Sequence, residues 1–224
     1  MNIKNRFKRW FRLRFAVTYP FIVFLAFFCN SDSRSVINAI WLIIAGFFIR
    51  IWANGYAIKL EKLTTSGPYA FVRHPLYLGT MLIICGFIVM LRAYYVGILF
   101  IAIIVAVYYR TIKNEEGMLE KKFKDLYIDY RKRVPAIVPT IFPYRLGEKW
   151  SFSLRRLIKS KEYKPFIWVV IIIIAFHLKY TLIIKHEKIG AKALALIIVA
   201  LSLGLLDLFG ELMKLIYKKK AKQW

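Results

Sequence analysis

The 224-residue chain is rich in both apolar and basic residues. Hydrophobic residues make up 59% of it and aromatic residues 17%, with a mean hydropathy of +0.52. Several apolar runs reach the roughly 20 residues that a helix needs to cross about 30 Å of hydrocarbon. This composition excludes an ordinary soluble domain, and it predicts an all-α integral membrane protein with about six transmembrane helices.

The formal net charge of +24 comes from 36 Lys and Arg residues against 12 Asp and Glu. The basic residues lie beside the apolar runs, so anionic lipid headgroups rather than nucleic acid are the expected counter-charge. Cys29 and Cys85 form neither a disulfide framework nor a metal-ligand spacing. We therefore expect a membrane partner, and neither nucleic acid nor a metal.

The N-terminal part, residues 1–35, reads as an anchor followed by a first span. Residues 1–14 alternate basic and aromatic side chains, which is typical of a helix lying on a membrane surface. Apolar runs at 15–29 and 36–53 predict the first and second spans. Arg50 is expected to mark the far interface of the second span.

A polar loop at 54–75 separates the second span from a predicted hairpin. The third and fourth spans are expected at 76–91 and 94–109, with only residues 92–94 between them. A link this short forces two helices to lie antiparallel as neighbours. The two cytoplasmic ends of the hairpin should therefore lie close together.

Residues 110–164 are polar and are expected to begin with a cytoplasmic helix. Val134-Pro135 and Val138-Pro139 should end this helix in an extended segment. Five residues recur at steps of three and four, which places them on one face of a helix. They are Glu116, Leu119, Phe123, Tyr127 and Tyr130.

The C-terminal part, residues 144–224, reads as a basic linker followed by spans at about 165–184 and 189–213. The orientation with most Lys and Arg inside places both termini, the central loop and residues 110–164 in the cytoplasm. Three lysines fall outside in this orientation: Lys185, Lys188 and Lys192.

Two carboxylates near the end of the last predicted span are interpreted as structural. Asp207 and Glu211 share one helix face, and we expect Lys214 or Lys218 to be their partners.

The predicted topology brings the central loop to the start of the cytoplasmic helix. Carboxylates there could bind an ammonium group or ribose hydroxyls, and an arginine could bind a carboxylate or a phosphate. Aromatic faces could bind a purine or a sulfonium cation. S-adenosylmethionine has these features, although the residues alone leave other amphoteric ligands open, and an ordinary interfacial loop with a snorkelling arginine is the plain alternative. The residues brought together are Tyr69, Arg73, His74, Tyr77, Arg110, Glu115 and Glu116.

Two motifs carry a resemblance to a known family. The first comprises Thr65-Ser-Gly-Pro-Tyr69, Arg73-His-Pro-Leu-Tyr77 and Gly79, and the second Glu115-Glu116, Leu119, Phe123, Tyr127, Tyr130, Val134-Pro135 and Pro139. Over residues 36–143 the sequence resembles the isoprenylcysteine carboxyl methyltransferase family, part of a wider group with the phospholipid methyltransferases. One departure is Ala136, where many relatives have Arg.

The resemblance implies a membrane enzyme core at 36–143 that holds S-adenosylmethionine in a cytoplasm-facing pocket, with cofactor motifs at 63–79 and 110–139. The expected cofactor-binding residues are Leu63, Thr64, Tyr69, His74, Pro75, Leu76, Tyr77, Glu115 and Glu116. The expected catalytic residues are Arg73, Arg110 and Glu116, with Arg110 steering an acidic acceptor.

The basic excess favours an acceptor with an anionic oxygen on a lipid or lipidated molecule. Such an oxygen needs positioning rather than a general base, whereas a neutral amine or thiol would need one, for which Glu116 or His74 is a candidate. Isoprenylcysteine carboxyl methylation, phospholipid N-methylation and a silent scaffold stay open as alternatives. We expect a multi-pass protein of a bacterial inner membrane rather than of the endoplasmic reticulum.

Overall fold

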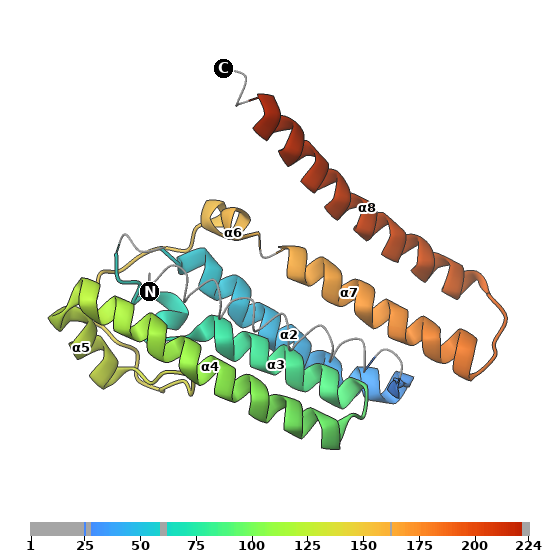
Figure 1. Ribbon diagram of the computed structural model, residues 1–224, viewed down its shortest axis with the longest axis horizontal. Helices are drawn as coiled ribbons and strands as arrows, with labels where there is room; N and C mark the ends of the chain where they lie inside the picture. Colours follow the sequence, from blue (N-terminus) through green and yellow to red (C-terminus); the bar gives the residue numbers. More distant parts are fainter. Residues whose placement is uncertain (1–24, 26–27, 59–61, 162, 221–224) are drawn as a thin grey trace, which may run out of the picture.

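The computed structural model describes residues 25, 28–58, 62–161 and 163–220, with the backbone alone for 211–220. This part of the chain contains seven α-helices and no strand, so the all-α prediction is confirmed for it (Figure 1). The helices are α2 (Ser33–Tyr56), α3 (Pro75–Met90), α4 (Tyr94–Phe123), α5 (Asp125–Arg133), α6 (Leu154–Ser160), α7 (Tyr163–Leu178) and α8 (Ala191–Lys220).

Among the described residues, four helices are long and apolar enough to cross a membrane. They are α2, α4, α8 and α7 together with its π-helical extension Lys179–Ile184. Helix α3 is equally apolar but has only 16 residues. The surface helix expected at 1–14 and most of the span expected at 15–29 lie outside the described residues, so six spans stay a prediction.

Helices α2 and α3 lie antiparallel and unusually close because glycines face one another. A Cβ on Gly46 would come within 2.5 Å of the Gly79 carbonyl oxygen, and one on Gly79 within 2.7 Å of the Gly46 oxygen. A Cβ on Gly86 would lie 2.5 Å from the Ile43 side chain. Small residues that let two backbones approach are a common device for packing membrane helices. These glycine contacts fix the position of α3 against α2. Because α3 directly follows the polar loop, they also fix where the loop ends.

Arg50 lies between α2 and α3. Its Nη1 donates to Thr80 Oγ1 at 2.5 Å and to the Leu76 carbonyl at 3.4 Å. The arginine expected to mark the interface ties α2 to the first two turns of α3. An ionisable side chain within an apolar helix is generally placed against a polar partner inside the bundle.

Helix α4 is longer than expected and continues past its apolar stretch. It lies along α3, where Ile88 contacts Gly97 and the Tyr77 and Tyr108 rings are 4.7 Å apart. Its 30 residues rise about 45 Å, more than the roughly 30 Å of hydrocarbon. The turns after Tyr109 therefore extend the same rigid helix into the polar region.

The predicted single cytoplasmic helix is wrong in one respect, because the chain breaks at Lys124. This residue has φ of 47°, a left-handed conformation that ends α4 before α5 begins. Leu119 and Phe123 on α4 still pack against Tyr127 and Tyr130 on α5. The apolar residues on the two sides of the break therefore pack against each other, and α5 lies beside the end of α4 (Figure 1).

The extended segment after α5, residues 134–144, covers the central loop. The Arg73 and His74 N–H groups donate to the carbonyls of Pro135 and Ala136 at 2.9 and 3.0 Å. Further along, the N–H groups of Thr140 and Tyr144 donate to the carbonyls of Phe71 and Ala70. These bonds satisfy the buried loop backbone and hold the first motif against the second.

Helices α7 and α8 form the C-terminal part of the fold. The Phe166 ring of α7 lies 5.3 Å from that of Phe47 on α2, whereas α8 leans away from the other helices (Figure 1). Lys164 pairs with Asp207 at 2.9 Å. The expectation that Asp207 pairs with a lysine of its own helix is therefore corrected, and the side chains of Glu211, Lys214 and Lys218 lie outside the described part.

Replacing Gly46 with Ala should destabilise the fold through a steric clash. The added methyl meets backbone, so α2 and α3 have to move apart, and overpacking of this kind costs about 1–3 kcal/mol. Gly204→Ala in α8 is the matched control, because nothing lies within 4 Å of its Cβ position. Thermal unfolding in detergent should show a lowered midpoint for Gly46→Ala and an unchanged or raised one for Gly204→Ala. Equal midpoints would contradict the close approach.

Candidate functional site

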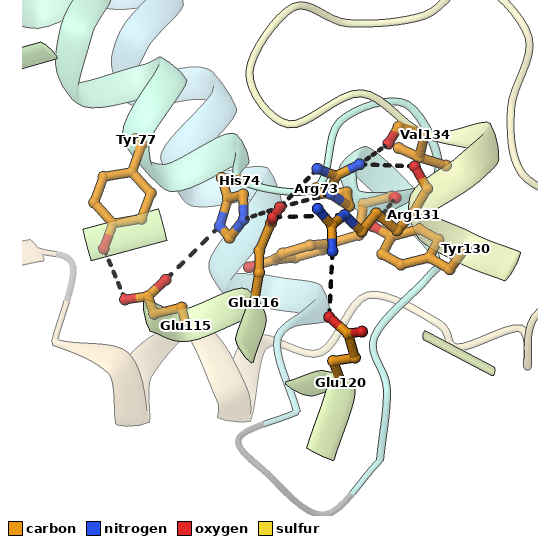
Figure 2. A network of polar contacts seen from close by, with 10 residues as sticks. Arg73, His74, Tyr77, Glu115, Glu116, Glu120, Tyr130, Arg131 and Val134 are labelled. Carbon is orange, nitrogen blue, oxygen red and sulfur yellow. Dashed lines mark hydrogen bonds and ion pairs between the residues drawn. The ribbon is translucent and has the colours of Figure 1, made fainter. Parts of the chain in front are cut away.

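Arg73 and Glu116 form the centre of a polar network at the end of the helical hairpin (Figure 2). Arg73 Nε donates to Glu116 Oε1 at 2.9 Å, and Nη2 lies 2.6 Å from the same oxygen. Nη1 donates to the carbonyls of Arg131 at 2.9 Å and Val134. A cation at the C-terminal carbonyls of a helix is favourably placed, so Arg73 joins α4 and the end of α5 to the loop.

His74 lies between two consecutive carboxylates of α4. Its Nε2 is 3.2 Å from Glu116 Oε1, and its Nδ1 is 3.7 Å from Glu115 Oε2. The Tyr77 hydroxyl donates to Glu115 Oε1 at 2.7 Å (Figure 2). Consecutive residues of the first motif thus contact consecutive residues of the second.

The tyrosines of α5 form the other wall of the network. The Tyr130 hydroxyl donates to the Tyr69 carbonyl at 2.6 Å, and burial raises the pKa of Tyr130, which keeps it a neutral donor. Tyr127 is 1% exposed, and burial together with the neighbouring Glu116 carboxylate raises its pKa, so it also stays a neutral hydroxyl.

The carboxylates of Glu116 and Glu115 differ in burial and in how closely positive charge surrounds them. Burial alone would raise the pKa of Glu116, but hydrogen bonds from His74 and Arg73 and the arginine charge lower it to about 2. Its side chain is only 9% exposed and its charge is already paired. The Glu115 side chain is 27% exposed and keeps one oxygen 3.7 Å from the histidine. Glu115 is therefore the carboxylate better placed to accept a group from outside.

Most of the residues expected at the site lie together. Arg73, His74, Tyr77, Glu115 and Glu116 form one continuous set of contacts. Their juxtaposition was expected from loop lengths alone, and these distances confirm it. Whether they bind a cofactor stays a prediction.

Four other expected residues shape the loop rather than join this network. Leu63 packs against the cluster of Tyr127 and its neighbours. Thr64 Oγ1 accepts from the Ile58 N–H at 3.1 Å, and Pro75 starts α3. The Leu76 carbonyl is already bonded by Thr80.

Arg110 stands on the same helix as the two carboxylates of the network. It is exposed on α4, and five residues of helix turn it about 140° away from Glu115. The grouping of Arg110 with the loop residues stays a prediction.

One residue that the sequence did not single out joins the network. Arg131 on α5 lies 4.0 Å from Glu116 Oε2 and 3.2 Å from Glu120 Oε2 (Figure 2). Nothing in a run of basic residues distinguishes Arg131 from its neighbours. Its proximity depends on the break at Lys124.

Comparison with known proteins confirms the resemblance drawn from the two motifs. Residues 20–125, just under half of the chain, match the family model described as phospholipid methyltransferase. This segment includes the polar loop, the hairpin of α3 and α4, and both carboxylates of the network.

The most similar relatives include both methyltransferases and proteins named for metal resistance. Protein-S-isoprenylcysteine O-methyltransferase of Schizosaccharomyces pombe is 37% identical over 37% of this chain and 35% of its own length. The Rattus norvegicus protein of the same name is 35% identical over 41% and 34%. Cobalt-zinc-cadmium resistance protein CzcN of Cupriavidus metallidurans is 32% identical over 46% and 48%.

The chain therefore spans about a third to a half of the length of these curated relatives. No solved structure matches it. Among the residues that the structure describes, no group of His, Cys, Asp and Glu is arranged to hold a metal ion.

Acid should destabilise the protein partly through Glu116. Its pKa is about 2 when folded and near the ordinary 4.5 when unfolded, so its contribution is complete above about pH 4.5 and is lost as the pH falls toward 2. Glu116→Gln removes this contribution, and its unfolding midpoint should fall less steeply across that window than that of the wild type. Glu120→Gln, which alters a more exposed carboxylate, serves as the control. Parallel profiles for Glu116→Gln and the wild type would contradict the paired state.

Proposed function

We propose that the chain is a membrane-embedded, S-adenosylmethionine-dependent methyltransferase. Its acceptor is an anionic oxygen, phosphate or carboxylate, of a lipid or lipidated molecule at the cytoplasmic face. The observation that carries the proposal is the network in which Arg73 neutralises Glu116 and leaves Glu115 partly exposed. The family match and the printed names of the relatives support the reaction class.

The residues present fit the proposed cofactor in charge and in hydrogen-bonding groups. Glu115 offers a partly exposed carboxylate for an ammonium or for ribose hydroxyls. Tyr77, which donates to Glu115, adds an aromatic side chain beside it. When bound, the cofactor supplies a methyl group on a positively charged sulfur. An anionic oxygen then needs positioning and partial desolvation.

Arg73 acts as a positioning residue in this proposal. Its guanidinium is 10% exposed and is taken up by Glu116 and two backbone carbonyls, so it is poorly placed to contact an acceptor. Arg131, which is 49% exposed at the same network, is a better candidate for an acidic acceptor. Arg110 could attract an acceptor only from a different side of α4.

The choice of an anionic acceptor rests on charge and on the position of the site. The excess of 36 basic over 12 acidic residues favours an acidic molecule at the membrane surface. Glu116 is held by His74 and Arg73, which lower its pKa to about 2 and leave it little basicity to deprotonate a neutral amine. We therefore place O-methylation ahead of N-methylation. A silent scaffold has no need of this network.

Cofactor binding should depend on Glu115 and not on a carboxylate nearby. Labelled S-adenosylmethionine should bind the purified protein in detergent, and Glu115→Gln should weaken binding at least tenfold by removing the exposed charge. Glu120→Gln, on the same helix, should change binding less than twofold. A folded wild type that binds no S-adenosylmethionine would favour the silent scaffold over the enzyme. Equal losses of binding in both variants would contradict the role of Glu115.

The linkage of the transferred methyl group should identify the acceptor class. Membranes supplied with labelled donor should carry label in the lipid fraction. Mild alkali should release it as methanol from a carboxyl ester, while a methyl phosphodiester should survive. Label recovered in a methylated ethanolamine after acid hydrolysis would contradict O-methylation.

A further inference from the structure

A second polar feature lies at the end of the bundle opposite the network. The turn between α7 and α8 lies near the start of α2 (Figure 1). Residues of this turn and Ser33 line a hollow of about 390 Å³. The proposed methyl transfer uses none of its residues. The hollow therefore requires its own explanation.

Positive charge dominates this hollow. Lys185, Lys188 and Lys192 line it, against the single carboxylate of Glu187. Glu187 lies 3.6 Å from Lys185 and offsets that charge. Lys188 and Lys192 are exposed and form no ion pair with any side chain that the structure describes. Two ammonium groups are thus available to an anion.

The remaining lining is suited to a lipid. Leu178 of α7 and Leu196 of α8 line the same hollow. A cationic rim above an apolar wall matches a phosphate attached to glycerol and acyl chains, whereas a free phosphate gains nothing from the wall.

The backbone of this turn is also irregular. Helix α7 ends in a π-helical segment, Lys179–Ile184, and His186 has φ of 51°, which is uncommon for a residue other than glycine. Both features occur often at functional sites. The lysines, moreover, lie on the side where the orientation rule disfavours them. A bound anion would offset the cost of lysines on this side.

We propose that this hollow binds the phosphate of an anionic phospholipid in the leaflet opposite the methyl-transfer site. Lys188 and Lys192 are the phosphate ligands, and Leu178 and Leu196 contact the glycerol and first acyl carbons. The proposal does not depend on the methyltransferase assignment, because no residue is shared between the two sites.

Native mass spectrometry and thermal unfolding of the full chain in detergent can test the site. Added phosphatidylglycerol should stay bound and raise the unfolding midpoint of the wild type, and phosphatidylcholine should do so at least tenfold less effectively. The double variant Lys188→Gln/Lys192→Gln should lose this preference. Lys121→Gln/Lys132→Gln, which removes two exposed charges at the other end of the bundle, should keep it.

Three results would overturn the proposal. They are equal retention of the two lipids by the wild type, an undiminished preference in Lys188→Gln/Lys192→Gln, and equal protection by millimolar inorganic phosphate, which would indicate a soluble ligand.

A second measurement uses the wild type and so does not depend on folding of the variant. A water-soluble acetylating reagent should modify Lys188 and Lys192 more slowly in phosphatidylglycerol nanodiscs than in phosphatidylcholine nanodiscs, while Lys121 reacts at one rate. Equal rates for all three lysines would count against the site.

Discussion

The structure depends most on the ion pair between Arg73 and Glu116. Both side chains are about nine-tenths buried, where a lone charge would be costly, so neither tolerates loss of the other. The same guanidinium also bonds the carbonyls of Arg131 and Val134 at the end of α5. One side chain thus holds the loop before α3, the polar end of α4 and the end of α5 in a single arrangement.

The rest of the site follows from that constraint. With Glu116 neutralised, the neighbouring Glu115 is held by Tyr77 and His74 and stays partly exposed. The close contact of Gly46 with Gly79 fixes the start of α3, and so the position of the loop residues relative to α4. Membrane packing and site geometry are therefore coupled through a helix only 16 residues long.

Apolar runs and short links in the sequence predicted much of this arrangement, but they did not predict contacts that depend on where the backbone changes direction. Apolar runs placed α2, α3, α7 and α8 within a few residues, because each run is long and bounded by polar residues. The short hairpin link brought Arg73 and His74 to the carboxylates. The break at Lys124 was missed because apolar spacing continues across it, and with it the position of Arg131. The position of Arg110 relative to the loop residues stays a prediction.

A double-mutant cycle on the central ion pair tests this account most directly. Arg73→Met and Glu116→Leu should each lower the free energy of unfolding in detergent strongly, since each leaves a buried charge without its partner. The double variant should be more stable than the sum of the two losses implies, because no lone charge remains. Strictly additive losses would show that the two side chains act independently, and would contradict the ion pair as the constraint on which the loop, α4 and α5 depend.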